Sequence, residues 1–169
     1  MASDAFPDIR WGHDRPLLKK PLDAFASSRF GSWYIRKMTP IDRKLLKRSN
    51  GRLTIFGPIG VPLLLLTTTG RKTGQPRTTP LTYMCEDDRL YLVGSNFGQR
   101  HHPAWSWNLL ANHDASVLMG GIEIPVTATM LTGGERERIF DKFVEYTRTY
   151  EEYTNRTTRD LRVFVLDRR

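Results

Sequence analysis

Residues 63–81 read Leu-Leu-Leu-Leu-Thr-Thr-Thr-Gly-Arg-Lys-Thr-Gly-Gln-Pro-Arg-Thr-Thr-Pro-Leu. The apolar start followed by threonines predicts a buried strand, because β-branched and apolar residues fit a pleated sheet. Gly70 and Gly74 interrupt the run, and its return predicts a second strand after a short loop. A cationic turn fixed between two strands can hold an anion in a defined place. The loop contains three cations and no acidic residue: Arg71, Lys72 and Arg77.

The rest of the chain shows several more short apolar runs bounded by turn signals, which suit an antiparallel meander. Predicted strands cover residues 53–56, 61–69, 77–84, 89–94, 115–119, 122–131 and 161–166. Helical spacing of apolar residues predicts helices over 22–38, 103–111 and 135–147, and a short helix over 39–51 with Thr39 as its cap and Pro40 at its first position. We therefore expect an α+β fold: a barrel of about six to seven mainly antiparallel strands with peripheral helices, since closure removes exposed sheet edges.

The length of 169 residues suits one domain. We expect an extended arm over residues 1–20, amphipathic helices over 21–50 and the barrel over 51–169. The single cysteine, Cys85, rules out an internal disulfide and favours a reducing compartment, and the start of the chain lacks a signal peptide. The longest apolar run, 61–66, is too short to span a bilayer. These features predict a cytoplasmic protein.

Positive charge is concentrated in the first half of the chain. Residues 1–80 hold 15 Lys/Arg against 5 Asp/Glu, a net +10, whereas residues 81–169 hold 11 against 13, a net −2. Such asymmetry favours a polyanionic partner: nucleic acid, an anionic membrane surface or a multiply charged cofactor. A basic face that only keeps the protein soluble is the simpler alternative. The basic helices at 21–50 could lie on an anionic bilayer, or could pack on the barrel with their charges in water.

Three further groups of residues could carry chemistry. The loop 94–105 follows a predicted strand, and Ser95, His101, His102 and Trp105 there could bind a ligand. Nucleophilic Ser–His chemistry is not favoured, because no Gly-x-Ser-x-Gly elbow is present, and no spacing of ligands indicates a metal. On the helix 103–111, residues two apart point to opposite sides, so one of Trp105 and Trp107 faces the core and the other, with Asn108, could face a pocket. Three tyrosines at helical spacing form either core packing or a lid over an apolar substrate: Tyr146, Tyr150 and Tyr153.

Taken in order, these motifs resemble the deazaflavin-dependent nitroreductase family over roughly residues 50–167. The resemblance rests on residues 67–77 (Thr-Thr-Thr-Gly-Arg-Lys-Thr-Gly-Gln-Pro-Arg), Pro80-Leu81, Ser95, residues 103–112 (Pro-x-Trp-x-x-Asn-Leu-x-Ala-Asn) and the late tyrosines. It implies a split β-barrel that binds coenzyme F420, a deazaflavin with a phosphodiester and an oligoglutamate tail. The implied cofactor-binding residues are Arg71, Lys72, Thr73, Gly74 and Arg77 for the phosphate and tail, and Thr79, Pro80, Leu81, Gly94, Ser95, Asn96 and Asn108 around the ring.

The resemblance also implies a reductase that passes a hydride from the reduced deazaflavin to a quinone, an enone or a nitroaromatic. A polyanionic cofactor accounts for the basic first half without nucleic acid, and the cofactor rather than the protein carries the redox chemistry. Ser95, Tyr150 and Tyr153 would position the substrate or supply a proton. The substrate pocket would comprise Phe97, Trp105, Tyr146, Tyr150 and Tyr153, with no metal.

This chain departs from the family's pattern at two places. Asn96-Phe97 stands where family members can carry Lys-Gly, and Tyr146 is shifted by one residue against the family's first lid tyrosine. Both changes leave the acceptor open, so nitroimidazole reduction is not assumed. Three alternatives also stay open: an FMN-dependent barrel, a carrier that stores the deazaflavin without catalysis, and a nucleic-acid-binding barrel. The last is disfavoured because this sequence lacks the interleaved aromatic and basic residues that such strands carry.

Overall fold

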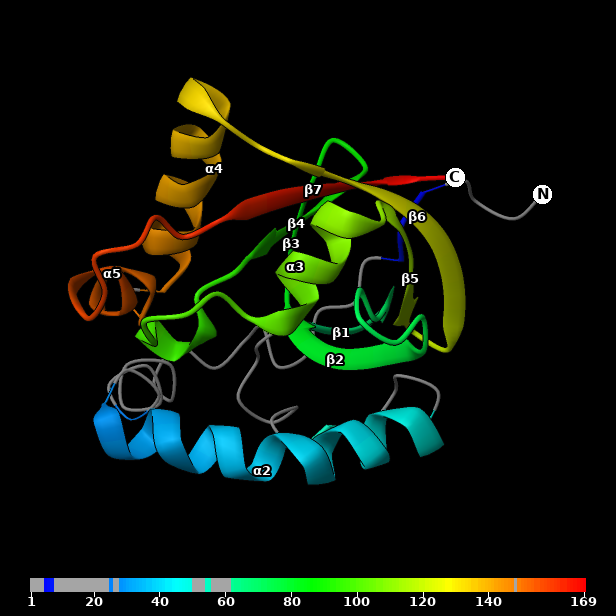
Figure 1. Ribbon diagram of the computed structural model, residues 1–169, viewed down its shortest axis with the longest axis horizontal. Coiled ribbons are helices and arrows are strands. Elements are labelled where there is room, and N and C mark those ends of the chain that lie inside the picture. The colour runs from blue at the N-terminus through cyan, green and yellow to red at the C-terminus, as the bar shows by residue number, and fades with distance from the viewer. Residues whose placement is uncertain (1–4, 8–24, 26–27, 50–53, 56–61, 148) are drawn as a thin grey trace.

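The computed structural model describes residues 5–7, 25, 28–49, 54–55, 62–147 and 149–169. Its strands come in groups of four, two and one along the chain, with helices before and between the groups (Figure 1). The strands are β1 (Leu63–Thr69), β2 (Pro76–Thr82), β3 (Met84–Glu86), β4 (Arg89–Val93), β5 (Asp114–Met119), β6 (Ile122–Met130) and β7 (Val163–Arg168). The described helices are α2 (Arg29–Arg48), α3 (Ala104–Ala111), α4 (Gly133–Tyr146) and α5 (Thr149–Asn155), together with the 3-10 turn η2 (Asn96–Gly98).

All seven strands form one antiparallel sheet in the order β2-β1-β5-β6-β7-β4-β3. Only Tyr83 separates β2 from β3, yet these two strands lie at opposite edges of the sheet. One residue can join the two edges only if the sheet curls until they approach each other, which is the geometry of a split barrel. The predicted α+β barrel of antiparallel strands is confirmed. The predicted strand 77–84 divides at Tyr83, so that its first part pairs with β1 and its last residue belongs to the strand that pairs with β4.

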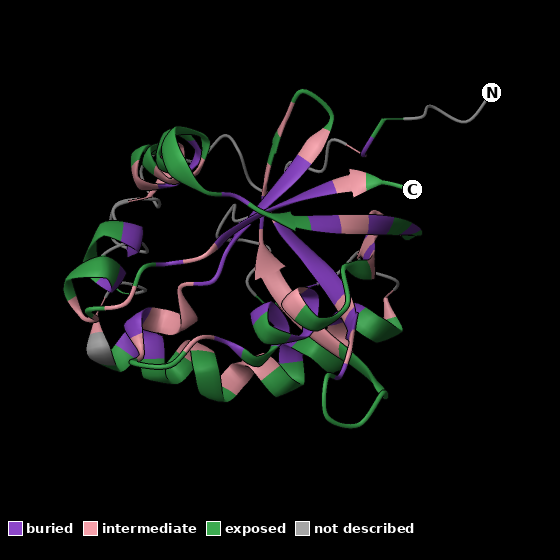
Figure 2. Cartoon of the chain, turned by 45° about the horizontal axis from the view of Figure 1, so that its top comes forward, coloured by how far each residue is buried: buried purple, intermediate pink, exposed green. Residues whose placement is uncertain are grey.

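The core has two parts because β4 and β7 are buried on both faces (Figure 2). Alternate side chains of a strand point to opposite faces, and here each set meets a different layer. One set fills the barrel interior together with Trp105 and Leu109 of α3: Leu90, Leu92, Phe164 and Leu166. The other set packs under α4 and α5, against Ile139, Phe143, Tyr150 and Tyr153: Tyr91, Val93, Val163 and Val165. Helices α4 and α5 therefore cover the outside of the barrel where β4 ends.

The two predicted N-terminal helices are wrong as separate elements. Helix α2 runs from Arg29 to Arg48 without a break, and Ser28 caps it by accepting a hydrogen bond at Oγ from the Gly31 amide at 2.8 Å. Pro40 lies inside it, and Thr39 is an interior residue whose hydroxyl donates to the Ile35 carbonyl at 2.8 Å. A proline inside a helix costs about 3 kcal/mol because it removes a backbone donor. Packing on the barrel offsets this cost, since Leu46 is fully buried.

Other boundaries differ for reasons of tertiary contact. Of the predicted strand 53–56, Thr54 and Ile55 are described, and they lie outside any strand because both donate to the buried carboxylate of Asp42 in α2. Of the predicted arm 1–20, residues 5–7 are described, and Phe6 is buried in the barrel core. The remaining residues of both segments lie outside the described part of the chain. The tyrosines at 146, 150 and 153 do not share one helix, because extended backbone at Thr147 separates α4 from α5.

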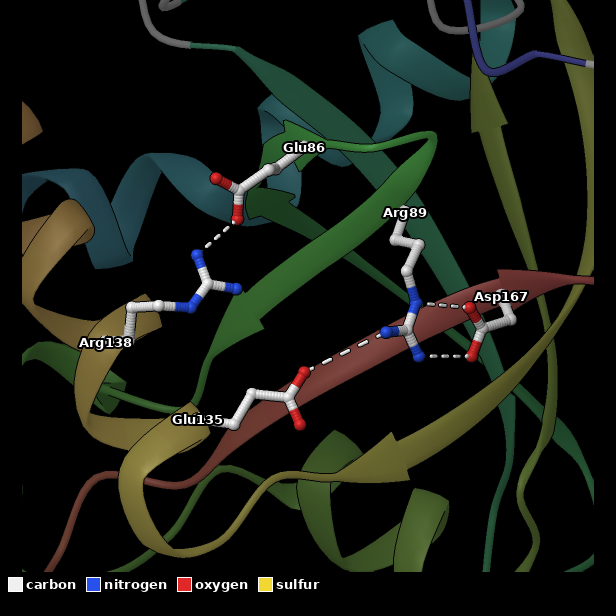
Figure 3. Close-up of polar contacts among 5 residues, drawn as sticks. All are labelled: Glu86, Arg89, Glu135, Arg138 and Asp167. Atoms are coloured by element: carbon white, nitrogen blue, oxygen red, sulfur yellow. Dashed lines mark hydrogen bonds and ion pairs between the residues drawn. The ribbon is translucent and has the colours of Figure 1, made fainter.

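Ion pairs attach α4 to the edge of the sheet (Figure 3). Glu86 of β3 accepts hydrogen bonds from Arg138 of α4, at 2.8 Å, and from Lys142 one turn later. Arg89 of β4 donates to both carboxylate oxygens of Asp167 in β7, at 2.6 and 3.1 Å. The edge strand β3 thus carries a charged side chain that is tied to α4, and charge on an edge strand disfavours pairing with another chain. No described helix is long and apolar enough to cross a membrane.

Candidate functional site

The anion turn, residues 70–77, is a rigid loop between β1 and the start of β2. The Gly70 amide donates to the Gln75 carbonyl at 2.8 Å, and the Gly74 amide donates to the Gly70 carbonyl at 2.7 Å. Gly74 has φ +66°, a conformation that glycine adopts without strain. A Cβ on Gly70 would lie 2.9 Å from Thr73 Oγ1, so only glycine fits there. The predicted strand–turn–strand is confirmed, with its loop closed by backbone hydrogen bonds.

The cations of the turn face solvent. Arg71, Lys72 and Arg77 are all exposed, and within the described part of the chain none of them forms an ion pair with a carboxylate. Arg77 Nη2 donates to Thr73 Oγ1 at 3.5 Å, which keeps that guanidinium beside the loop. Three uncompensated cations on a fixed loop fit a ligand that carries several negative charges, such as a phosphodiester with a carboxylate chain.

Asn108 fastens this turn to α3. Its Oδ1 accepts a hydrogen bond from the Arg71 amide at 3.1 Å, and its Nδ2 donates to Thr68 Oγ1 at 3.0 Å. Both Asn108 and Thr68 are buried, so these bonds are shielded from water. Helix α3 in turn is anchored in the barrel by Trp105 and Leu109. Asn108 therefore sets the position of the cationic turn relative to the barrel.

The strand after the turn presents its half-buried face beside the same region. Thr79, Pro80 and Leu81 lie on β2 opposite Leu66, Leu65 and Leu64 of β1, and each is partly exposed. β2 is an edge strand that pairs with β1 alone in the sheet, so a proline, which has no N–H, can interrupt hydrogen bonding on one side at most. Helix α2 runs next to β2, where Arg43 Nη1 donates to the Thr78 carbonyl at 3.5 Å.

The loop after β4 has an unusual backbone. Ser95 is right-handed helical, and the next three residues have positive φ: Asn96 (46°), Phe97 (56°) and Gly98 (72°). A right-handed residue followed by left-handed ones points successive N–H groups to one side, an arrangement that suits anions. The Asn96 side chain donates to the His101 carbonyl at 2.9 Å, so its amide is directed within the loop.

Arg159 holds this loop in place from the other end of the sequence. Its guanidinium donates to the carbonyls of Ser95 at 2.7 Å, Gln99 at 2.9 Å and Gly94 at 3.1 Å. Its Nη1 also lies 3.2 Å from His102 Nδ1, which must accept this hydrogen bond. Burial, with the nearby charges of Arg162 and Arg159, lowers the pKa of His102, so that imidazole is neutral at pH 7.

The two tryptophans of α3 lie on opposite sides of the helix, as their spacing predicts: one is buried and the other is exposed. Trp105 is buried in the barrel core, edge-on to Phe164 at 5.5 Å between ring centroids. Trp107 is the exposed one. The guanidinium carbons of Arg162 and Arg71 lie 3.9 and 5.3 Å from the centroid of its ring. The His102 ring meets it edge-on at 5.7 Å.

An aromatic cluster of Phe97, Phe143, Tyr150 and Tyr153 joins the loop to α5. Phe97 lies edge-on to Tyr153 at 6.0 Å, Tyr153 to Tyr150 at 6.3 Å, and Tyr150 to Phe143 at 5.1 Å. Burial raises the pKa of both tyrosines, so both phenols keep their protons at neutral pH. Their hydroxyls interact with Thr82 at the end of β2 and with Ser32 of α2, respectively. Tyr146 is half-buried at the end of α4.

The structure thus brings most of the predicted site residues to two regions. The turn, with Asn108, forms a cationic region, and Phe97 with Tyr150 and Tyr153 forms an aromatic one between the Ser95 loop and α2. The sequence did not indicate that Arg159 and Arg162 belong to the site. No local pattern shows that residues just before the last strand reach the Ser95 loop and Trp107 of α3.

Comparisons with known proteins show which proteins this chain resembles in sequence and fold. Residues 36–168 match the family model described as F420H(2)-dependent quinone reductase. An F420H(2)-dependent quinone reductase from Mycobacterium tuberculosis is 38% identical over 128 residues, which are 74% of this chain and 86% of that protein. A solved structure of an F420-H2 dependent reductase is 38% identical, with a TM-score of 0.58 over 63% of this chain and 94% of the other. Another, described as a domain-swapped dimer, is 35% identical, with a TM-score of 0.59 over 76% of this chain and 100% of the other.

Proposed function

Because the chain belongs to the F420H(2)-dependent quinone reductase family, we propose that it is an F420-dependent oxidoreductase that reduces a small quinone-type acceptor. The cofactor supplies the hydride when it is bound. The protein supplies binding, orientation and exclusion of water. The observation that carries this proposal is the rigid anion turn, whose exposed cations have no carboxylate partner in the described part of the chain and which Asn108 fixes to the barrel.

The residues of the cationic region would bind the charged part of the cofactor. Arg71, Lys72 and Arg77 provide guanidinium and ammonium groups for the phosphodiester and the tail, and Thr73 and Gly74 shape the loop that carries them. Thr79, Pro80 and Leu81 of β2, which are half-buried, would border the deazaflavin ring together with Gly94, Ser95 and Asn96. Asn108 acts through the turn as a positioning residue, because both of its described bonds go to the protein.

The aromatic region would receive the acceptor. Phe97 is partly exposed and would present an apolar surface, backed by the buried rings of Tyr150 and Tyr153, that favours flat, electron-poor molecules; Tyr146 stands half-buried at the end of α4. Both buried phenols remain protonated, so Tyr150, Tyr153 and the hydroxyl of Ser95 can donate hydrogen bonds to an acceptor oxygen. Besides quinones, we propose enones and nitroaromatics as slower acceptors, since an aromatic wall with few charges selects weakly.

Single-turnover oxidation of the reduced cofactor tests this function. We expect the protein to accelerate oxidation by menadione well beyond the rate in buffer, and to accelerate oxidation by cyclohexenone less. A protein that binds the reduced cofactor but speeds its oxidation by none of these acceptors would be a carrier instead. Tight binding of FMN together with weak binding of F420 would replace the proposal with a flavin-dependent reductase of the same fold.

We also propose that α2 contacts an anionic membrane surface. Its outer face carries exposed apolar residues, of which Phe30 and Trp33 stack at 5.9 Å, and its only acidic residue, Asp42, is buried. Aromatic side chains flanked by Lys and Arg suit the interface of an anionic bilayer. In vesicle flotation, the protein should float with anionic vesicles and not with zwitterionic ones, and Trp33→Ser should reduce this binding. Equal recovery with both kinds of vesicle would contradict the proposal. Exposed residues of this face are Phe30, Trp33, Tyr34 and Ile41.

A further inference from the structure

A second group of cations lies next to the anion turn, around the exposed indole of Trp107. This indole clamp consists of Arg71, Trp107 and Arg162. The guanidinium carbon of Arg162 is 3.9 Å from the ring centroid, and that of Arg71 is 5.3 Å away. Trp107 is 37% exposed, so the clamp opens to solvent. Two positive groups are therefore held against one aromatic ring at the protein surface.

The donors of the clamp are largely free, in contrast to those of Arg159 nearby. Arg159 directs its N–H groups to three carbonyls and to His102, so they are used within the protein. The one hydrogen bond described for the Arg162 guanidinium goes to Ser106 Oγ, at a long 3.4 Å. Among the described residues, neither Arg162 nor Arg71 forms an ion pair with a carboxylate. Partial burial lowers the pKa of Arg162, so the unpaired charge is held at a cost that a bound anion would offset.

The chemistry of the clamp fits carboxylates. The guanidinium of Arg162 lies over the indole of Trp107, and a planar guanidinium can donate two N–H groups to one carboxylate at once. The backbone of Arg71 belongs to the anion turn, so an anionic chain that leaves the turn passes directly to the clamp. A single small anion would need only one of these two places, whereas a chain with several carboxylates can use both.

We propose that the indole clamp binds glutamate carboxylates of the cofactor's tail, and that Arg162 makes the protein prefer cofactor with a tail over cofactor without one. This inference rests on the proposed function. Arg71 serves both the turn and the clamp, whereas the Arg162 guanidinium has no described hydrogen bond to the turn. Arg162 is therefore the residue whose removal separates tail binding from the rest of the site.

The test is fluorescence titration of the protein with three forms of the deazaflavin: with phosphate and glutamates, with phosphate alone, and ending at the ribityl chain. Arg162→Gln should raise the Kd for the first form about tenfold, the loss expected for one charge-assisted contact, and leave the other two unchanged. Arg162→Lys should lose part of this affinity, because the charge remains but the planar stack does not. Arg168→Gln removes the same charge from the exposed far end of β7 and should change none of the three.

Three outcomes would overturn the inference. Equal losses for all three ligands would mean that Arg162 supports the fold or the loop rather than the tail. Unchanged binding of the tailed form would show that the tail lies elsewhere. Wild-type protein that binds no form of the deazaflavin would overturn the proposed function together with the clamp, and this result differs from the other two because it needs no variant. Thermal unfolding of Arg162→Gln checks that the variant remains folded.

Discussion

Replacing Asn108 with alanine should both destabilise the protein and release the anion turn. The substitution removes the acceptor of the Arg71 amide and the donor to Thr68 Oγ1, at 3.1 and 3.0 Å in the native protein. It leaves the backbone of β1 and α3 in place, since neither bond belongs to a strand ladder or to the helix. Asn108 is thus a point where stability and cofactor binding depend on the same two hydrogen bonds.

The magnitude follows from burial. Each bond contributes about 0.5–1.5 kcal/mol net, so losing both costs about 2 kcal/mol. Thr68 is only 2% exposed, and its hydroxyl would lose a buried donor, so the cost should not fall below this value. For a chain of this length, about 2 kcal/mol lowers Tm by about 4–8 °C.

Thermal unfolding and fluorescence titration measure the two effects. The matched control is Asn112→Ala, which removes the same side chain from the exposed end of the same helix, where it accepts one bond from the Asp114 amide. We expect its free energy of unfolding to change by about 0.5 kcal/mol or less. Asn108→Ala should also weaken binding of the tailed cofactor more than that of a phosphate-free analogue. If both variants lower Tm equally, or if Asn108→Ala leaves cofactor binding intact, Asn108 does not position the turn.

Three further predictions concern the turn and the ion pairs. Gly74→Ala should lower the free energy of unfolding by about 1 kcal/mol, because alanine is strained at φ +66°. The control Gly134→Ala, in α4 with open space around it, should raise the free energy of unfolding by about 0.5–1 kcal/mol, measured by urea unfolding. A Gly74→Ala variant that is more stable than the wild type would contradict the turn geometry. The double variant Arg71→Ala/Lys72→Ala should weaken binding of F420 far more than binding of the phosphate-free analogue. The affinity of the wild-type protein for F420 should fall with added salt. Equal losses of affinity for both ligands would show that the turn does not bind the charged end of the cofactor. Hydrogen bonds from Lys142 and Arg138 lower the pKa of Glu86 below its ordinary value of 4.5, so its contribution to stability is present above that value and is lost as the pH falls through the native pKa. Glu86→Gln should therefore flatten the fall in Tm between about pH 5 and pH 3, by a small amount because these side chains are partly exposed; an unchanged pH profile would show that the pair contributes nothing.

Local signals in the sequence were enough to predict the strand pairing around the anion turn and the antiparallel barrel. Glycine spacing, threonine-rich strands and a cationic loop all lie within residues 63–81, and the turn closes through its own backbone. The same locality explains the correct helices at α3 and α4. Pro40 misled the prediction, because packing of α2 on the barrel outweighs the preference of proline for a helix start.

What the sequence could not predict depends on contacts between distant segments. Helical spacing showed that Trp105 and Trp107 face opposite ways, but only the barrel determines which one is buried. Arg159 reaches the Ser95 carbonyl across 64 positions of sequence, and no local pattern indicates such a contact. Tyr83 reads as the interior of one strand, yet it is the point where the chain passes from one sheet edge to the other.

Side-by-side fluorescence titration of the wild-type protein with F420 and FMN tests the central claim most directly. The cationic turn, uncompensated by any carboxylate in the described part of the chain, predicts that F420 binds much more tightly than FMN, because its tail adds several negative charges to one phosphate. It also predicts that this preference shrinks as salt is added. FMN that binds as tightly as F420, or a preference for F420 that does not respond to salt, would contradict the assignment of the anion turn to the cofactor's charged end.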